Sequence, residues 1–251
     1  MIVNMENCVG NRVIAWFSCG VTSAAATRLC IDKFPETIPV YCDTGSEHPD
    51  NTRFIRDCEQ WYDREIKILR SKKYTDIWDV FEKTKYLAGV NGARCTTELK
   101  KLVRREFELP DDLQIFGFDS SELHRAEKFR ANNFEVDTWF PLIEADLSKA
   151  DCIERLLEAG IDMPAMYKLG FRNNNCIGCV KGAAGYWNKI RDTFPDVFAK
   201  MAAAERKLNV ALNKSYAGDG KRKRVFLDEL DPSAGNYKDL EIKCGLFCGE
   251  I

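Results

Sequence analysis

The chain has 251 residues, 45% of them hydrophobic and 30% charged, which suits one large α/β domain or a domain with a substantial appendage. Its formal net charge of -2 excludes a bulk electrostatic affinity for nucleic acid or anionic lipid, although a local patch stays open. No apolar run approaches the roughly 20 residues that span a bilayer, and the N-terminus lacks a signal-peptide pattern, so we expect a cytoplasmic protein without a membrane partner.

The first half of the chain alternates predicted strands and helices. Short apolar runs predict strands over 12–17, 38–42, 66–69 and 114–118. Apolar periodicity and helix-start residues predict helices over 22–33, 49–62, 75–83, 96–107 and 120–132. This alternation is typical of a doubly wound, mostly parallel sheet, in which ligands bind beyond the carboxyl ends of the strands.

After Pro141 the pattern changes to helices and cysteine-containing loops. Helices are predicted over 148–159, 163–170, 186–191 and 195–208. The segment AGDGKRKR at 217–224 is predicted to be a loop, whose basic run is either a solvated surface or a contact for a phosphate backbone or protein partner. We therefore expect a nucleotide-binding α/β domain over 1–140, and an α-helical, cysteine-bearing extension over 141–251 that packs on the ligand edge of the sheet.

A loop of small and hydroxyl-bearing residues follows the first predicted strand. Ser18, Gly20, Thr22 and Ser23 lie between this strand and the start of the next helix. Small residues let the backbone approach a phosphate closely, while backbone N–H groups and the helix N-terminus supply a positive field. The segment therefore indicates an anion-binding loop, and a tight strand–helix turn with a capped helix is the alternative.

The cysteine content is the anomaly of the composition. An odd count of 11, without an export signal, argues against a disulfide framework and for reduced thiols. Cys30, Cys42 and Cys58 lie in or beside apolar periodic segments and are predicted to be core residues. Cys176 and Cys179 form NCIGC, in which two thiolates can bind one metal centre from a single turn; zinc, a redox disulfide and coincidence are alternatives.

Six segments together resemble one known family. They are SCGVTS at 18–23, YCDTGSEHPDN at 41–51, ARCTTELKK at 93–101, GFDSSELHR at 117–125, the stretch from PLI to the CxxC at 141–179, and KCGLFCG at 243–249. In this order they resemble the motifs of the phosphoadenylyl-sulfate (PAPS) reductase family in the PP-loop (adenine nucleotide α-hydrolase-like) superfamily. The resemblance implies a PP-loop, HUP-like α/β fold and an adenine nucleotide as ligand.

The resemblance also implies which residues hold the nucleotide. The loop would bind phosphate or sulfate, the DTG segment would lie beside the nucleotide, and basic side chains would neutralise anionic oxygens. The implied set is Ser18, Cys19, Gly20, Thr22, Ser23, Asp43, Thr44, Gly45, Arg94, Lys100, Gly117, Glu122 and Arg125. Cys19 and Thr22 stand where the ATP-cleaving loop has glycine and aspartate, so ATP, PAPS and adenylyl sulfate are all candidate ligands, with Mg²⁺ as a further candidate cofactor.

The same resemblance implies roles for several cysteines. Iron–sulfur members of the family bind a [4Fe–4S] cluster beside the nucleotide, which implies Cys95, Cys176, Cys179 and Cys248 as ligands here, with Cys244 as the alternative fourth ligand. Three ligands would instead leave one iron open to carry substrate sulfur. Cys244 also matches the family cysteine that attacks the sulfur of a bound sulfate ester, so Cys244 and Cys248 are the candidate catalytic residues.

Three functions are compatible with these features. The first is a sulfonucleotide reductase that releases sulfite and takes electrons from a thioredoxin-type partner. The second is ATP-dependent, iron–sulfur-assisted sulfur transfer to a nucleic acid or another substrate, as in DNA phosphorothioation and tRNA thiolation, with a cysteine desulfurase as sulfur source. The third is a nucleotide- or redox-sensing binding protein. A homo-oligomer is expected in each case.

Overall fold

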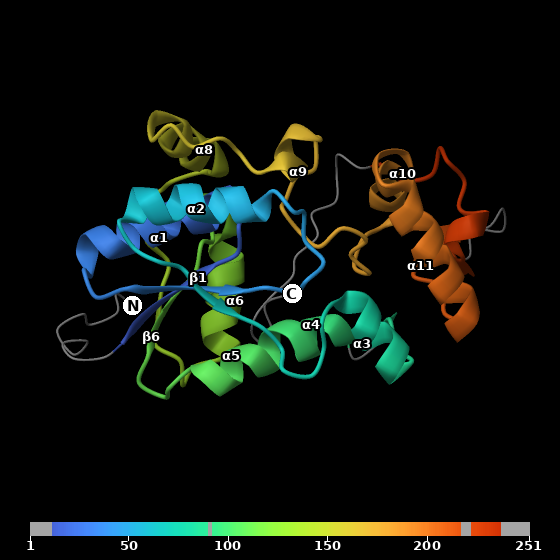
Figure 1. Ribbon diagram of the computed structural model, residues 1–251, viewed down its shortest axis with the longest axis horizontal. Helices are drawn as coiled ribbons and strands as arrows, with labels where there is room; N and C mark the ends of the chain where they lie inside the picture. Colours follow the sequence, from blue (N-terminus) through green and yellow to red (C-terminus); the bar gives the residue numbers. More distant parts are fainter. Residues whose placement is uncertain (1–11, 90–91, 217–221, 237–251) are drawn as a thin grey trace.

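The computed structural model describes residues 12–89, 92–216 and 222–236 (Figure 1). Its centre is a five-stranded sheet of order β3-β2-β1-β6-β7, in which every neighbouring pair is parallel. The strands are β1 (Val13–Phe17), β2 (Ile38–Cys42), β3 (Lys67–Leu69), β6 (Leu113–Ile115) and β7 (Thr138–Trp139). The predicted parallel sheet is therefore confirmed.

The described chain has helices before and after residue 140, and some of them, among them α2, α5 and α6, pack on the two faces of this sheet. Those of the first half are α1 (Val21–Lys33), α2 (Asn51–Tyr62), α3 (Ile77–Thr84), α4 (Arg94–Thr96), the π-helix η2 (Thr97–Lys101), α5 (Leu102–Phe107), the 3₁₀ turn η3 (Ser120–Glu122) and α6 (Leu123–Asn132). Those that follow are α7 (Pro141–Glu144), α8 (Lys149–Glu158), α9 (Ala165–Lys168), α10 (Ala184–Thr193), α11 (Pro195–Leu208) and η4 (Leu227–Glu229). None of the described helices combines the length and apolar character needed to cross a membrane.

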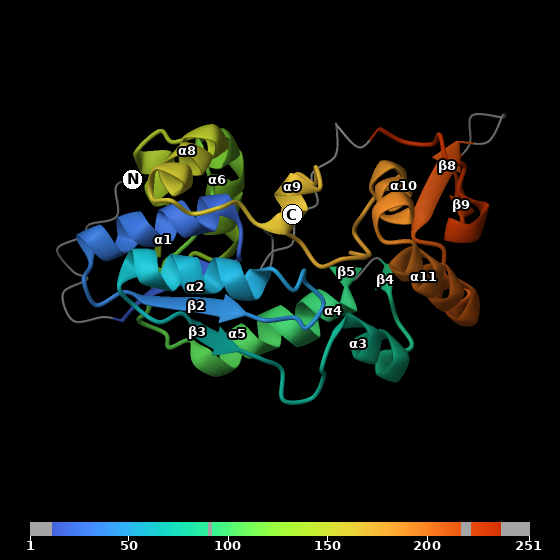
Figure 2. The ribbon, with the colours of Figure 1, turned by 45° about the horizontal axis from the view of Figure 1, so that its top comes forward.

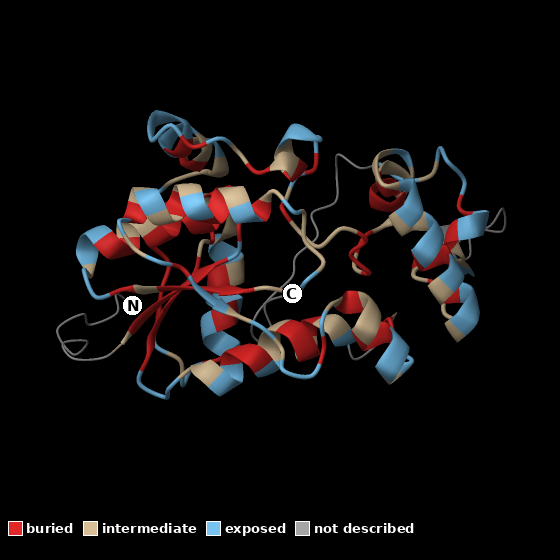
Figure 3. Cartoon of the chain, viewed as in Figure 1, coloured by how far each residue is buried: buried red, intermediate tan, exposed pale blue. Residues whose placement is uncertain are grey.

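Strand β1 shows how the two faces are packed. Successive side chains of a strand point to opposite faces, so Phe17 packs with Phe54 of α2 in one cluster, whereas Trp16 packs with Val103 of α5 and Phe129 of α6 in another. Figure 3 shows the central strands almost wholly buried and the surrounding helices buried along one side, whereas the edge strand β3 is mostly exposed. The doubly wound arrangement predicted from the strand–helix alternation is thus confirmed.

A second core lies beside the sheet domain. It joins Val80 of α3 and Leu99 of η2 to Trp187 of α10 and Met201 of α11. Figure 2 shows α10 and α11 at the far end of the molecule from α1. These contacts bring segments before residue 140 together with segments after it, and the division of the chain at residue 140 stays a prediction.

Two short hairpins were not predicted from the sequence. β4 (Ala88–Gly89) pairs with β5 (Gly92–Ala93), and β8 (Asn213–Tyr216) pairs with β9 (Arg222–Val225), both antiparallel. The prediction of a loop was therefore wrong for 222–224, and 217–221 lie outside the described residues. The run KRKR lacks the alternation of apolar and polar residues by which a half-buried strand is identified, so the sequence pattern did not indicate a strand here.

Candidate functional site

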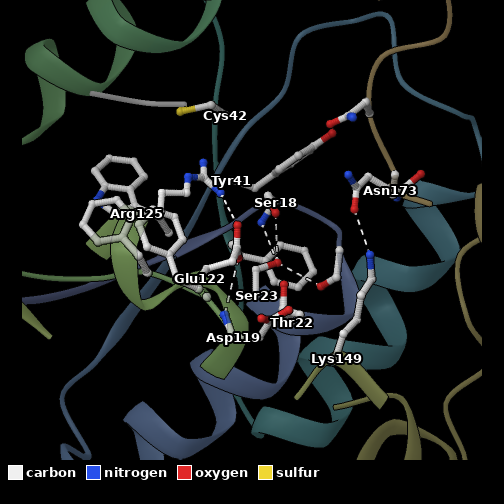
Figure 4. A pocket seen from close by; sticks show the side chains of 18 of the residues that line it. Ser18, Thr22, Ser23, Tyr41, Cys42, Asp119, Glu122, Arg125, Lys149 and Asn173 are labelled. Atoms are coloured by element: carbon white, nitrogen blue, oxygen red, sulfur yellow. Dashed lines mark hydrogen bonds and ion pairs between the residues drawn. The ribbon is translucent and has the colours of Figure 1, made fainter. Parts of the chain in front are cut away.

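A polar pocket opens beyond the carboxyl ends of β1, β2 and β6 (Figure 4). From β1 the chain winds outward through β2 and β3, then returns to β6 on the other side of β1. The connections after β1 and β6 therefore diverge and leave a crevice, as parallel sheets do where the strand order reverses. The lining residues are Trp16, Phe17, Ser18, Gly20, Thr22, Ser23, Tyr41, Cys42, Lys100, Phe116, Gly117, Phe118, Asp119, Glu122, Arg125, Lys149, Tyr167, Asn173, Asn174 and Asn175.

The loop between β1 and α1 is held in shape by the hydroxyl of Ser23. This oxygen accepts a hydrogen bond from Ser18 N at 3.0 Å, lies 3.1 Å from Ser18 Oγ and donates to the carbonyl of Gly20 at 2.9 Å. The first turn of α1 carries no acidic residue, so its N-terminal N–H groups meet no competing carboxylate of their own helix. The loop thus has the form of an anion site, with Thr22 beside it on the pocket wall.

Cys19 contributes backbone rather than side chain to this loop. Its φ of 55° lies in the left-handed region that favours glycine, and its side chain is fully buried in the core with Phe17 and Cys58. Burial raises the pKa of the Cys19 thiol well above its usual range, so the group is uncharged at neutral pH. Its carbonyl accepts a hydrogen bond from Asn174 Nδ2 at 2.7 Å, which joins the loop to the segment before the CxxC.

Gly117 allows the segment that follows β6 to lie directly against the start of α1, beside the loop between β1 and α1. A Cβ at this position would stand 2.6 Å from Ser23 Cα and 2.7 Å from Ser23 N. Atoms of a main chain cannot give way as the end of a flexible side chain can, so only glycine fits here. This close approach lets residues after β6 form the opposite wall of the pocket.

That opposite wall carries both charges of an ion pair. Arg125 donates to Glu122 at 2.8 Å and stacks over the ring of Phe118 at 4.1 Å. Asp119 accepts from the N–H and hydroxyl of Ser121 at 3.0 and 2.6 Å, and caps the start of η3. These contacts fix the guanidinium at the rim, where its planar fork suits an anionic oxygen pair.

Lys100 and Glu47 form a buried ion pair at the floor of the site. The Nζ–Oε1 distance is 3.6 Å, and the two side chains are 14% and 4% exposed. Burial raises the pKa of Glu47, while Lys100 acts in the opposite direction. The same carboxylate accepts from the hydroxyl of Tyr41 and from Asn51 Nδ2 at 3.3 Å.

Lys100 lies on the π-helix η2, inside the longer helical stretch 94–107. An extra residue in a helical turn changes the direction of the side chains that follow it, and such insertions are frequent at functional sites. Nothing in the local sequence signalled the π-turn. The lysine itself was expected at the site because of the resemblance in ARCTTELKK.

Three of the proposed cluster cysteines line a second, smaller cavity, which adjoins the first at Lys100. Its lining residues are Thr44, Ile77, Ala93, Cys95, Thr96, Leu99, Lys100, Cys176, Cys179, Val180 and Lys181. Cys176 Sγ lies 3.0 Å from Thr44 Oγ1 and 4.0 Å from Glu47 Oε1. A set of thiolates is the donor chemistry of iron–sulfur or zinc sites. Within the described ranges, no group of three or more His, Cys, Asp or Glu is arranged to hold a metal ion.

Some residues predicted to hold a nucleotide lie away from the polar pocket, and others lie outside the described residues. Asp43 pairs with Arg70 at 2.7 Å and, with Gly45, lines a separate surface hollow. Arg94 pairs with Glu98 at 2.6 Å and is 48% exposed, outside the lining of the pocket. The candidate catalytic residues Cys244 and Cys248, the second also a predicted cluster ligand, lie outside the described residues.

The remaining cysteines with structural predictions lie in the core. Cys30, Cys42 and Cys58 are buried, which confirms that prediction. Burial raises the pKa of Cys42 to about 11 and that of Cys58 to about 12, so neither thiol ionises near neutral pH. Cys42 reaches the wall of the polar pocket as a neutral thiol.

Sequence reasoning missed several lining residues. Lys149, at the start of α8, donates to Asn173 Oδ1 at 2.8 Å and lies within 5.3 Å of the ring centre of Tyr167. No local pattern separates Lys149 from other helix-start lysines. The run Asn173, Asn174 and Asn175 did offer a signal, since three consecutive amides before a CxxC are unusual for a plain loop.

The glycine at 117 gives a direct test of the pocket wall. We expect Gly117→Ala to lower the free energy of unfolding by about 1–3 kcal/mol, because the added methyl overlaps the backbone of Ser23. The matched control is Gly20→Ala, whose Cβ would meet side-chain oxygens at ordinary contact distances, Ser18 Oγ and Tyr167 Oη at 3.5 Å and Ser23 Oγ at 3.9 Å. Urea unfolding followed by tryptophan fluorescence measures both. Equal stabilities for the two variants would contradict the close approach.

Comparison with known proteins gives the family of the chain. An uncharacterized protein of Methanocaldococcus jannaschii is 22% identical over 193 residues, which cover 73% of this chain but 45% of that protein, so the chain spans less than half of its length. The phosphoadenosine phosphosulfate reductase domain matches residues 12–184, a range that contains both cavities described above. The chain therefore belongs to the phosphoadenosine phosphosulfate reductase family of the PP-loop superfamily.

Proposed function

We propose that the protein is a sulfonucleotide reductase, which binds PAPS or adenylyl sulfate in the pocket at the end of β1 and releases sulfite. The observation that carries the proposal is the position of Lys100, which lines both the nucleotide pocket and the cysteine cavity. An anion held between the loop and Lys100 would have its sulfur end directed toward the cysteines. The aromatic rings of Phe116 and Tyr167 offer apolar surface for the adenine.

The charges around the pocket favour a sulfonucleotide over Mg²⁺-bound ATP. Mg²⁺ usually takes carboxylate oxygens together with substrate phosphates. The acidic residues that line the described pocket are Asp119 and Glu122, and both already accept hydrogen bonds from Ser121 or Arg125. Backbone N–H groups, Lys100 and Arg125 can instead balance a sulfate–phosphate anhydride without a metal.

The chemical step would use a cysteine as nucleophile. A thiolate, for which Cys244 is the candidate, attacks the sulfur of the sulfate group, so an S–S bond forms and the bond from sulfur to the phosphate oxygen breaks. The nucleotide leaves with that electron pair, and Arg125 and Lys100 offset the negative charge that builds on its phosphate. A thioredoxin-type dithiol then attacks the cysteine sulfur, releases sulfite and leaves as a disulfide after a second thiol exchange.

The cysteine cavity would complete the site with a [4Fe–4S] cluster. Cys95, Cys176 and Cys179 would supply three ligands, and Cys248 or Cys244 the fourth. When bound, the cluster would supply an electron-rich, polarisable centre beside the sulfur-bearing end of the nucleotide. Thr44, whose hydroxyl lies 3.0 Å from Cys176 Sγ, would orient that thiolate by hydrogen bonding.

A second candidate is ATP-dependent sulfur transfer. The observation that favours it is the convergence of three cysteines on one cavity, which suits a centre that carries sulfur as well as one that assists reduction. In this case the pocket would hold ATP, adenylation would activate a substrate oxygen, and a cysteine desulfurase would provide the sulfur.

Nucleotide binding can be tested at Lys100. We expect Lys100→Ala to weaken binding of PAPS or adenylyl sulfate by about 10- to 100-fold, because a charge-assisted contact worth about 1.5–3 kcal/mol is lost. Lys101→Ala is the matched control, since the neighbouring lysine does not line the pocket. Isothermal titration calorimetry measures both affinities. A similar loss in the two variants would contradict the assignment of Lys100.

The reaction can be tested by its product. With reduced thioredoxin and the cluster intact, we expect sulfite from PAPS or adenylyl sulfate, and we expect Cys244→Ser to abolish its release while nucleotide binding is retained. Sulfite is quantified by thiol-reactive dye after chromatography. If ATP alone is turned over to AMP and pyrophosphate, and neither sulfonucleotide yields sulfite, the reductase proposal fails and sulfur transfer takes its place.

The cluster can be tested by colour. Anaerobically purified protein should absorb broadly in the visible and contain iron and sulfide, and Cys176→Ala should lose most of that absorbance. Cys152→Ala is the control, because Cys152 is fully buried in the hydrophobic core that contains residues of α1 and α2, and it does not line the cysteine cavity. Colourless protein with bound zinc would overturn the assignment.

A further inference from the structure

The proposed chemistry leaves one strongly basic part of the chain without a role. Residues 181–225 contain eleven Lys and Arg against four Asp and Glu, a net charge of +7 in a chain whose total is -2, so the rest carries -9. Such an asymmetry of charge within one chain indicates a polyanionic partner for the basic part. The hairpin β8–β9 carries the densest part of this charge.

The hairpin is anchored to the helical core. Glu205 of α11 is fully buried and accepts hydrogen bonds from Leu212 N at 2.6 Å and Leu227 N at 2.5 Å, one at each base of the hairpin. Arg224 donates to the carbonyl of Ala211 at 2.6 Å. The basic side chains are therefore attached to a backbone that is already held in place. Less conformational entropy is then lost when a ligand binds them.

The register of the hairpin places like charges opposite each other. Lys214 pairs directly with Arg224, and both are exposed, as is Lys223. Directly opposed like charges destabilise a hairpin. Among the residues that the structure describes, no ion pair includes any of these three side chains; the nearby acids Asp228 and Glu229 pair with Arg206 at 2.7 and 2.6 Å. The positive charge is thus left uncompensated within the described chain.

We propose that the β8–β9 hairpin binds the phosphodiester backbone of a nucleic acid. The register places Lys214 and Arg224 on one face of the two-stranded ribbon and Lys223 on the other face, so a polyanion that follows the ribbon can contact cations on both faces. Among the described residues, the large apolar side chains that are exposed all lie outside 181–225. Binding to a membrane surface would need exposed apolar side chains within this region as anchors. Contacts of Lys and Arg with phosphates carry no sequence information, so the binding is independent of base sequence.

The hairpin lies away from the nucleotide pocket, beside α10 and α11 (Figure 2). The inference therefore does not depend on the proposed reaction. It nevertheless bears on the choice between the two reactions, because a nucleic acid is a substrate only in the second. A single-stranded or double-stranded, DNA or RNA ligand would satisfy the same chemistry, and the experiment distinguishes them.

The test is fluorescence anisotropy of the full chain with labelled 30-nucleotide single-stranded DNA, the same RNA, and duplex DNA over a range of salt concentrations. For the best ligand we expect the double variant Lys214→Glu with Lys223→Glu to bind at least 10-fold more weakly, and the slope of log K against log salt to fall by about 2. Because Lys214→Glu places a carboxylate opposite Arg224, thermal stability should be unchanged or higher. Loss of binding together with gain of stability cannot come from misfolding.

The matched control makes the same charge change on the sheet domain, with Lys67→Glu and Arg105→Glu, both at exposed positions. We expect this variant to bind nucleic acid nearly as the parent does. The proposal is overturned if no oligonucleotide binds in a salt-dependent way, if both double variants lose affinity equally, or if polyglutamate competes as well as nucleic acid, which would indicate an acidic protein partner. The affinity for PAPS or adenylyl sulfate, measured by calorimetry, should be the same in the parent and in both double variants. This result separates the test of the hairpin from the test at Lys100.

Discussion

The buried ion pair between Glu47 and Lys100 is the interaction on which the arrangement of the two cavities depends. Taking both charges out of water costs several kcal/mol per ion, and removing one partner of such a pair typically costs about 3–5 kcal/mol. The hydroxyl of Tyr41 and the amide of Asn51 offset part of this by hydrogen bonding to the carboxylate. The pair ties β2 and the start of α2 to the π-helix, and it leaves a lysine between the nucleotide pocket and the cysteines.

Close backbone packing positions the other side of the site. Because Gly117 lies against Ser23, the segment after β6 reaches the phosphate loop, and Arg125 lies at the pocket wall. Asn174 then links the loop to the cysteine segment by donating to Cys19 O and Asn51 Oδ1, each at 2.7 Å. The loop after β1 and the segment before Cys176 are thus joined through the buried side-chain amide of Asn174.

Much of the fold could be predicted because its determinants are local. Apolar periodicity located β1, β2, α1, α2 and α11 to within about two residues, since packing against one core selects the same face that the sequence displays. The strand predicted over 114–118 ends at Ile115 in the structure, and the two-residue strand β7 is too short for any period to show. Of the site, Ser18, Gly20, Thr22 and Ser23 were found from the local pattern of small and hydroxyl-bearing residues. The resemblance of short motifs added Lys100, Gly117, Glu122 and Arg125, and both sets line one pocket.

The sequence by itself determined the strand–helix alternation, the loop of small and hydroxyl-bearing residues after β1, and the family motifs, because each depends on residues close together in the chain. Tertiary structure alone decided that Glu47 lies under Lys100, that Lys149 and the Asn173–Asn175 run face the pocket, and that three cysteines meet at one cavity. It also made a strand of Arg222–Val225, because Glu205 and β8 hold that segment in place. The ion pair between Glu47 and Lys100 and the contact between Thr44 and Cys176 join residues far apart in the chain, and no local pattern of apolar, polar or charged side chains encodes such contacts. The contacts that hold Arg222–Val225 are shorter in range, but they depend on Glu205 and β8 rather than on the run itself.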